Sequence, residues 1–282
     1  MIIKISLLFE QNSLNMKKLE QILNKVMCMK GYNELYKLNA FSINDVEKLT
    51  NNRKTAYSII NRLMKKDMVR KIRNNVYSCV NPATGQVLAS RYQIACAVNA
   101  SSYISHHSAF EYYGLANQVY YEVYISSDAK FRDFEFEGIS YRYISSKLQE
   151  GIIEPKNSEG IRITDLERTV IDNIKDFDKI GGFEELLNCL EGIRYLNEDK
   201  LKKYLLSYDL QILYQKVGFI LNHYKHEMHL SDNFIEYCKS KVGKSTRYLV
   251  KESSSESLYI SEWKLVIPLD LFNLGYGGDD LV

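Results

Sequence analysis

Basic and amide side chains alternate with apolar ones at helical spacing between residues 53 and 66. The inner face of such a helix would hold Ala56, Ile59, Ile60 and Leu63. The outer face and its flanks would carry Arg53, Lys54, Tyr57, Ser58, Asn61, Arg62 and Lys65, with no acidic residue between them. Asparagine can pair with adenine through two hydrogen bonds, and lysine donates to guanine or to phosphate. This chemistry is that of a helix lying in the major groove of double-stranded DNA.

Charge is distributed unevenly along the chain. Of its 37 basic and 35 acidic residues, 15 and 6 lie within residues 1–80, so this end carries +9 and the remainder −7. Lys71 and Arg73 lie beside an Asn74-Asn75 pair, on its N-terminal side, and are placed to meet the DNA backbone or minor groove. The alternative is a solvated basic helix that binds nothing. RNA is disfavoured, because the sequence predicts no exposed sheet of aromatic residues for stacking bases.

A second polar pattern occupies residues 164–172. Thr164 and Glu167 have the spacing of a capping box, which predicts that Thr164 begins a helix running through Ile174. Arg168 and Asp172 are four residues apart and can pair on one helical face, while Asp165 lies three residues before Arg168. Thr164, Asp165, Arg168, Thr169 and Asp172 could form a structural ion-pair cluster, or a surface that engages a partner or its substrate.

Two further patterns raise the question of an enzyme. His223, His226 and His229 recur every three residues, but on a straight helix the outer two would diverge, and the H-E-x-x-H metal motif is absent. Asp128-Ala129-Lys130 and Glu262-Trp263-Lys264 resemble the D/E-x-K element of two-metal nucleases. No phosphate-binding loop, nucleophile elbow or dinucleotide fingerprint occurs. We therefore expect no enzyme, no catalytic residue, no metal and no cofactor.

The elements around the basic helix follow a definite order. Helices are expected over residues 17–28, 33–38 and 42–49, the last with Ser42 as its N-cap and Ile43, Val46 and Leu49 facing inward. Thr50-Asn51-Asn52 forms a turn before the basic helix, and strands at 68–72 and 76–80 follow, joined by the Asn pair. Helix, helix, turn, helix and hairpin predict a winged helix-turn-helix over residues 1–82.

The remainder, residues 83–282, is expected to be a larger mixed α/β domain, which makes the chain α+β overall. The boundary is placed at the turn-forming segment around Pro82, where the charge also changes sign. Helices are expected at 90–100, 105–115, 164–174, 183–191, 198–206, 212–223 and 233–240, and strands at 119–125, 139–144, 248–250 and 264–268.

Cysteine usage and hydropathy bear on the compartment. The five cysteines, Cys28, Cys79, Cys96, Cys189 and Cys238, are odd in number and far apart, which favours free thiols in a reducing cytoplasm. The apolar run at residues 1–9 is too short for a membrane span and lacks a signal-peptide cleavage site. A cytoplasmic protein without membrane contact is therefore expected. Met16 is a plausible alternative start, so residues 1–15 could be an artefact or a loose arm.

Several segments, in order, resemble the AbiEi family of type IV toxin–antitoxin antitoxins. They are Arg70-Lys71-Ile72-Arg73-Asn74-Asn75-Val76-Tyr77, with Asn75 where the family often has glycine, then Ile104-Ser105-His106-His107-Ser108-Ala109 with Gly114-Leu115, Ile163-Thr164-Asp165-Leu166-Glu167-Arg168-Thr169-Val170-Ile171-Asp172, and Lys216-Val217-Gly218-Phe219-Ile220-Leu221. The third segment is the most specific. The resemblance spans roughly residues 30–225, and the last 50 residues match loosely.

The resemblance implies a DNA-binding N-terminal domain that represses its own operon through inverted repeats, with two copies expected on the DNA. It also implies that the C-terminal domain neutralises a nucleotidyltransferase-like toxin, without requiring a stable complex. Two alternatives stay open. One is a winged-helix transcriptional regulator whose larger domain senses a ligand or dimerises, and the other is a nuclease that is targeted by its winged helix.

Overall fold

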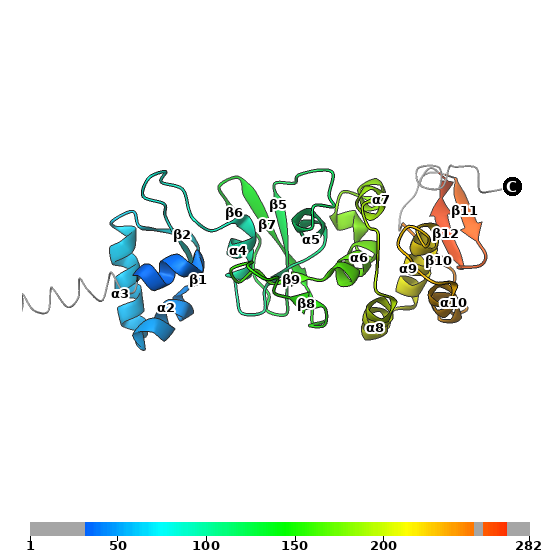
Figure 1. Ribbon diagram of the computed structural model, residues 1–282, viewed down its shortest axis with the longest axis horizontal. Helices are drawn as coiled ribbons and strands as arrows, with labels where there is room; N and C mark the ends of the chain where they lie inside the picture. Colours follow the sequence, from blue (N-terminus) through cyan, green and yellow to red (C-terminus); the bar gives the residue numbers. More distant parts are fainter. Residues whose placement is uncertain (1–31, 251–255, 270–282) are drawn as a thin grey trace, which may run out of the picture. The chain divides into compact units, whose positions relative to one another are not determined.

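The computed structural model describes residues 32–250 and 256–269 (Figure 1). Its helices and strands are mixed along the chain, which confirms the predicted α+β class. The chain divides into two compact units, one ending at Ala100 and the other beginning at Ser101. The predicted helix over 17–28, the suspected arm at 1–15 and Cys28 lie outside the described residues.

The first unit contains short helices packed around a small antiparallel sheet. Residues 32–38 are helical, and α4 (Arg91–Cys96) is the last helix of the unit. Between them come β1 (Ala40–Ser42), α2 (Ile43–Thr50), α3 (Arg53–Met64), β2 (Val69–Arg73) and β3 (Val76–Cys79). The strand order is β1-β3-β2. Ala56, Ile60 and Leu63 of α3 are buried in the core of this unit, as their spacing predicted.

Local sequence explains where these elements begin and end. Ser42 caps α2 in a capping box with Asp45, and Asn52 caps α3 through the backbone N–H of Thr55. Asn51 and Asn75 hold the two turns at φ 52° and 63°, a conformation that asparagine tolerates. Leu49 was predicted to face inward, but it is 48% exposed. Three-residue steps each rotate by about 60° around a helix, so Leu49 has turned away from the face of Ile43.

The first unit continues past the predicted boundary at residue 82. Pro82 lies in a turn that is closed by a 2.8 Å hydrogen bond from the N–H of Asn81 to the carbonyl of Gln86. The chain then returns toward β3, where Val87 bridges to Val80 and Leu88 packs against the core. Apolar residues after the turn therefore belong to the first unit.

The second unit is built around a six-stranded mixed sheet with the order β6-β7-β5-β4-β9-β8. These strands are β4 (Tyr103–Ile104), β5 (Glu122–Ser127), β6 (Phe134–Phe136), β7 (Ile139–Ser145), β8 (Ile152–Ile153) and β9 (Ile163–Thr164). The β5–β7 and β4–β9 pairs are parallel and the others are antiparallel. Helix α5 (His107–Tyr112) lies against β5 (Figure 1).

Helices form the rest of the second unit. They are α6 (Leu166–Lys175), the 3₁₀ turn η1 (Phe177–Lys179), α7 (Phe183–Glu191), α8 (Glu198–Tyr208), α9 (Gln211–His223) and α10 (Asp232–Ser240). A small sheet of β10 (Arg247–Tyr248), β11 (Ser257–Ile260) and β12 (Leu265–Pro268) follows. Trp263 and apolar residues from α6–α10 form one continuous core. The helices expected after residue 160 are confirmed to within about two residues, whereas those expected at 90–100 and 105–115 are shorter and span residues 91–96 and 107–112. No helix in residues 32–250 or 256–269 has the length and apolar character needed to span a membrane.

Gly218 is closely packed against its neighbours in this core. A Cβ added there would lie 2.2 Å from the Trp263 ring and 2.9 Å from the Cβ of Cys238. Because both neighbours are buried, Gly218→Ala should lower the free energy of unfolding by about 1–3 kcal/mol through overpacking, against a gain in helix propensity of at most about 1 kcal/mol. Chemical denaturation measures this, with His223→Ala at an exposed position of α9 as the control. Equal stability of the two variants would contradict the contact.

Candidate nucleic-acid interface and buried polar clusters

The outer face of α3 is accessible along its whole length. Arg53, Lys54, Tyr57, Ser58, Asn61 and Lys65 are exposed, and Arg62 is half-buried. The inner face of the same helix packs through Ala56, Ile60 and Leu63. The structure therefore gathers the predicted α3 residues on one solvent-facing surface that has hydrogen-bond donors, acceptors and positive charge.

Two side chains on this surface are held by neighbours in the same unit. The guanidinium of Arg53 donates to Glu47 at 2.8 Å and to Asn44 at 3.3 Å, and it lies over the Tyr57 ring. These contacts raise the pKa of Arg53, chiefly through the Glu47 carboxylate. The Tyr57 hydroxyl in turn donates to Asn75 Oδ1 at 3.4 Å. Arg53 is thus tethered to α2, whereas Tyr57 connects α3 to the β2–β3 turn.

The β2–β3 hairpin presents the two remaining basic residues of the predicted interface. Lys71 is exposed, while Arg73 is half-buried, and burial lowers the pKa of its guanidinium. Both residues lie just before the turn at Asn74-Asn75, and the strand register shifts between them. Lys71 is therefore the more accessible of the two.

The predicted start of α6 is wrong by one residue. Thr164 is part of β9 and pairs with Ile152, so its backbone cannot open a helix. Asp165 is the N-cap instead, and its carboxylate accepts the N–H of Arg168 at 3.0 Å. The Thr164 hydroxyl contacts that of Thr169 at 2.8 Å. Both threonines consequently join the strand to the helix.

Arg168 and Asp172 form an ion pair with 1% of each side chain exposed. Arg168 Nε donates to Asp172 Oδ1 at 2.8 Å, and Nη1 donates to the Glu150 carbonyl at 2.8 Å. The Tyr208 ring lies 5.0 Å from the guanidinium, and its hydroxyl donates to Asp172. Burial alone would lower the pKa of Arg168, but the Asp172 carboxylate outweighs it, so the pKa of the guanidinium is raised.

Asp165 and Glu167 extend this network to α8. The Tyr204 hydroxyl donates to Asp165 Oδ2 at 2.7 Å, and Lys200 Nζ donates to Asp165 and to Glu167 at 3.0 and 3.2 Å. Lys200 is 46% exposed, but Thr164, Asp165, Arg168, Thr169 and Asp172 are all buried. The five predicted motif residues are therefore brought together inside the second unit. They do not form its surface, but they hold in place the elements that do.

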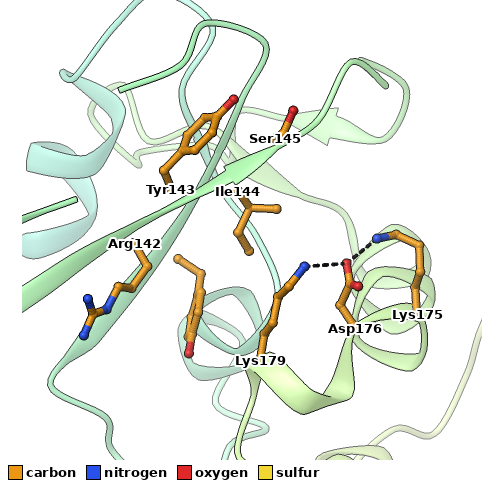
Figure 2. Close-up of a pocket in the computed structure, with 8 residues that line it drawn as sticks. Arg142, Tyr143, Ile144, Ser145, Lys175, Asp176 and Lys179 are labelled. Carbon is orange, nitrogen blue, oxygen red and sulfur yellow. Dashed lines mark hydrogen bonds and ion pairs between the residues drawn. The ribbon is translucent and has the colours of Figure 1, made fainter. Parts of the chain in front are cut away.

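A pocket of about 420 Å³ opens between β7 and the end of α6 (Figure 2). It is lined by Tyr124, Arg142, Tyr143, Ile144, Ser145, Lys175, Asp176 and Lys179. Asp176 pairs with Lys175 and with Lys179. Arg142 donates to Glu122 at 2.8 Å. This pocket could not be predicted from the sequence, because its basic residues come from segments more than 30 positions apart.

The buried imidazole of His106 contacts the pocket residue Asp176. His106 Nδ1 is 2.8 Å from the Ser105 hydroxyl, and Nε2 is 3.5 Å from Asp176 Oδ2. The His106 backbone has φ 55° and ψ −140°, a conformation that is strained for a residue with a side chain. Burial would raise the pKa of Asp176, but the contacts with His106 and Lys175 outweigh it and hold that pKa well below its ordinary value.

The other candidate catalytic patterns are dispersed. His223, His226 and His229 are exposed at and beyond the end of α9, and Glu262 pairs with Lys239. Asp128 and Lys130 are exposed after β5. Within the described residues, one group of three potential metal ligands occurs, His107 with Glu185 and Cys189, and it includes none of these. This group could not be predicted from the sequence, because His107 and Glu185 are far apart in the chain.

The buried ion pair should matter far more than exposed ones. Asp172→Asn leaves the guanidinium of Arg168 without a counter-charge, which should lower the free energy of unfolding by about 3–5 kcal/mol. Arg142→Ala removes a half-exposed pair with Glu122 and should cost less than about 1 kcal/mol. Urea denaturation of both variants provides the comparison. Similar losses of unfolding free energy in the two variants would show that the buried Arg168–Asp172 pair stabilises the protein no more than an exposed pair does.

Asp176 should make stability depend on acid pH. Its folded-state pKa is lowered below the unfolded value of about 3.9, so its contribution is complete above that pH and is lost as pH falls toward the folded pKa. Asp176→Asn should therefore be less stable than the parent protein near neutral pH, and the difference should shrink below about pH 4. Thermal denaturation across this range measures the effect. A difference that is independent of pH would contradict it.

Comparison with known proteins supports the fold. No family model and no curated protein sequence matches the chain. The crystal structure of the RV2827C protein from Mycobacterium tuberculosis is similar, with a TM-score of 0.53 and 14% sequence identity over 81% of this chain and 86% of that chain. At this level of identity the likeness concerns the arrangement of helices and strands alone, and across most of both chains this arrangement is shared.

Proposed function

We propose that the chain is a DNA-binding antitoxin that represses its own operon and neutralises a nucleotidyltransferase-like toxin. The observation that carries the DNA-binding half is the outer face of α3, where Lys54, Ser58, Asn61 and Lys65 are exposed together. The order of α2, α3 and the β2–β3 hairpin is that of a winged helix-turn-helix. In this arrangement α3 enters the major groove and the hairpin contacts the adjacent backbone.

Each element has a separate task in the proposed complex. Asn61 is the side chain suited to base recognition, since an amide can both donate to and accept from adenine. Lys54, Lys65 and Lys71 supply positive charge for phosphates or guanine. One such unit covers one half-site, so two copies on an inverted repeat are expected. Whether contact between the copies precedes DNA binding does not affect this geometry.

The antitoxin half of the proposal rests on the sequence resemblance to AbiEi proteins. The motif residues from Thr164 to Asp172 are buried, so we infer that they hold the second unit in shape and do not touch the toxin. Lys200, which is half-exposed above Asp165 and Glu167, is the part of this network that reaches the surface. Neutralisation of the toxin would then depend on the folded structure of the whole second unit.

A second candidate function is a winged-helix regulator whose second unit senses a ligand. The pocket between β7 and α6 favours it, because Arg142, Lys175 and Lys179 offer positive charge beside two tyrosine rings. Regulation by a small anion would make DNA affinity change when that anion is added. An antitoxin that acts independently of ligands would show no such change.

DNA binding can be tested at the side-chain level. Lys54→Ala and Lys71→Ala should each weaken binding to DNA from upstream of the gene and reduce the slope of log affinity against log salt by about one. Asn61→Ala should relax the preference for specific over scrambled DNA instead. Fluorescence anisotropy at several salt concentrations measures both effects. The control is Lys203→Ala on α8, whose lysine is exposed in the second unit.

Unchanged affinity in Lys54→Ala and Lys71→Ala would remove α3 and the hairpin from the interface. The toxin-related half is tested by co-expression with the neighbouring gene. The full chain carrying both lysine substitutions should lose repression of its promoter and still rescue growth. Absence of toxicity from the neighbouring gene, or failure of the unsubstituted chain to rescue, would remove the antitoxin assignment and leave DNA binding standing.

A further inference from the structure

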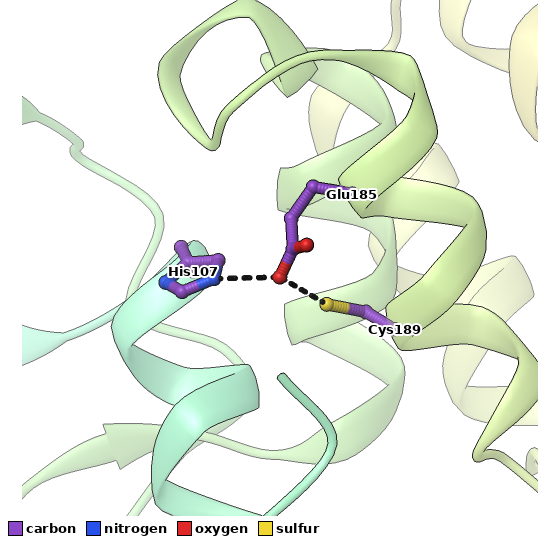
Figure 3. Close-up of side chains that lie close together, drawn as sticks. All are labelled: His107, Glu185 and Cys189. Carbon is purple, nitrogen blue, oxygen red and sulfur yellow. Dashed lines mark hydrogen bonds and ion pairs between the residues drawn. The ribbon is translucent and has the colours of Figure 1, made fainter. Parts of the chain in front are cut away.

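Three potential metal ligands meet inside the second unit, and none of them lines the pocket beside α6 (Figure 3). His107 Nε2 is 3.0 Å from Glu185 Oε1, and Cys189 Sγ is 3.6 Å from the same oxygen. The three donor atoms lie within 4.8 Å of one another. In Figure 3 the Glu185 carboxylate lies between the imidazole and the thiol.

Two helices bring these side chains together. Glu185 and Cys189 are four residues apart on α7, so they project from one face of that helix. His107 is the first residue of α5 and approaches from the opposite side. Ligands on two elements are typical of a metal that joins parts of a fold, because neither helix alone supplies the full set.

Burial leaves the carboxylate with incomplete compensation. His107 and Cys189 are wholly buried, and Glu185 is 3% exposed. Glu185 Oε2 is a buried oxygen without a hydrogen-bond partner among the described residues. A carboxylate in such surroundings is costly unless a cation or several donors compensate it. The unpartnered oxygen belongs to the same carboxylate that faces the other two ligands, so a cation held there would supply the missing compensation.

We propose that His107, Glu185 and Cys189 bind a zinc ion. Nitrogen, sulfur and oxygen ligands together suit Zn²⁺, whereas Mg²⁺ and Ca²⁺ prefer oxygen alone. Zinc–ligand bonds of about 2.0–2.3 Å in a tetrahedron place neighbouring donor atoms roughly 3.3–3.7 Å apart. The distances of 3.0 and 3.6 Å around Glu185 Oε1 are close to this arrangement. The third distance, between the donor atoms of His107 and Cys189, is at most 4.8 Å and would shorten by up to about 1 Å on zinc binding.

Three protein ligands leave the fourth tetrahedral position to a water molecule, and the burial of all three ligands favours a structural ion over a catalytic one. The Tyr120 ring packs over His107 at 4.1 Å between ring centroids and covers that side of the cluster. On binding, the Cys189 thiol would lose its proton to solvent and the thiolate would bond to zinc. The ion would fasten the start of α5 to α7. This site is independent of the proposed DNA-binding face, and either assignment can fail without the other.

The test uses the untagged full chain, first for zinc content and then for its complex with Co²⁺. Elemental analysis after desalting should give about one zinc per chain. Replacement of zinc by Co²⁺ should produce a thiolate-to-metal absorption band in the near ultraviolet together with the strong visible bands of a tetrahedral site. Cys189→Ser should abolish the ultraviolet band. Cys238→Ser, which alters another buried thiol outside the cluster, should retain it.

Three outcomes would overturn the proposal. They are an unsubstituted chain that retains no zinc after incubation with excess zinc and desalting, a Co²⁺ complex without the thiolate band, and a thiolate band that persists in Cys189→Ser. If a cysteine variant fails to fold, the zinc content and Co²⁺ spectrum of the unsubstituted chain still decide the matter. His107→Gln offers an independent check, since it should weaken zinc retention without removing a thiol.

Discussion

The guanidinium of Arg168 is buried, so the second unit depends on the groups that compensate its charge. Asp172 supplies the counter-charge from the next turn of α6, Glu150 supplies a carbonyl from the loop before β8, and Tyr208 supplies a ring from α8. One side chain thereby joins a loop of the sheet to two helices. Removal of Asp172 would leave an uncompensated charge in the interior, and loss of the carbonyl or the ring would weaken its compensation, so the sheet and the helices are held in a single arrangement.

The first unit places its charge differently. Its core is almost wholly apolar, and its basic groups lie on the outside of α3 and the hairpin. Exposed lysines contribute little to stability, so their arrangement is free to serve a polyanion. The second unit instead buries its most distinctive polar residues. The contrast accords with the proposal that the first unit binds DNA through surface charge.

Long periodic segments could be predicted from the sequence, and short or non-local features could not. The buried stripe of α3 and the bounds of α7 follow from apolar spacing, and α9 was placed to within one residue. Strands β4, β8 and β9 have two residues each, too few for any period to appear. Thr164 was assigned to a cap because its pairing with β8 depends on Ile152, which is twelve positions away.

The candidate sites also differ in whether their residues come from one segment of the chain or from several. The exposed face of α3 was predictable because one helix carries all of it. The cluster of His107, Glu185 and Cys189 combines a predictable half, the four-residue spacing on α7, with a histidine 78 positions earlier. The pocket beside α6 likewise brings Arg142 to Lys175 and Lys179. Only the path of the chain through the sheet brings these residues together.

The backbone of His106 is strained at the point where α5 begins. Its φ and ψ angles would relax if the imidazole lost its contacts with Ser105 and Asp176, because no side-chain cap otherwise holds the helix start. The neighbouring His107 takes its direction from the same turn. The backbone conformation of one buried residue therefore fixes the direction in which the imidazole of the next residue points, toward Glu185.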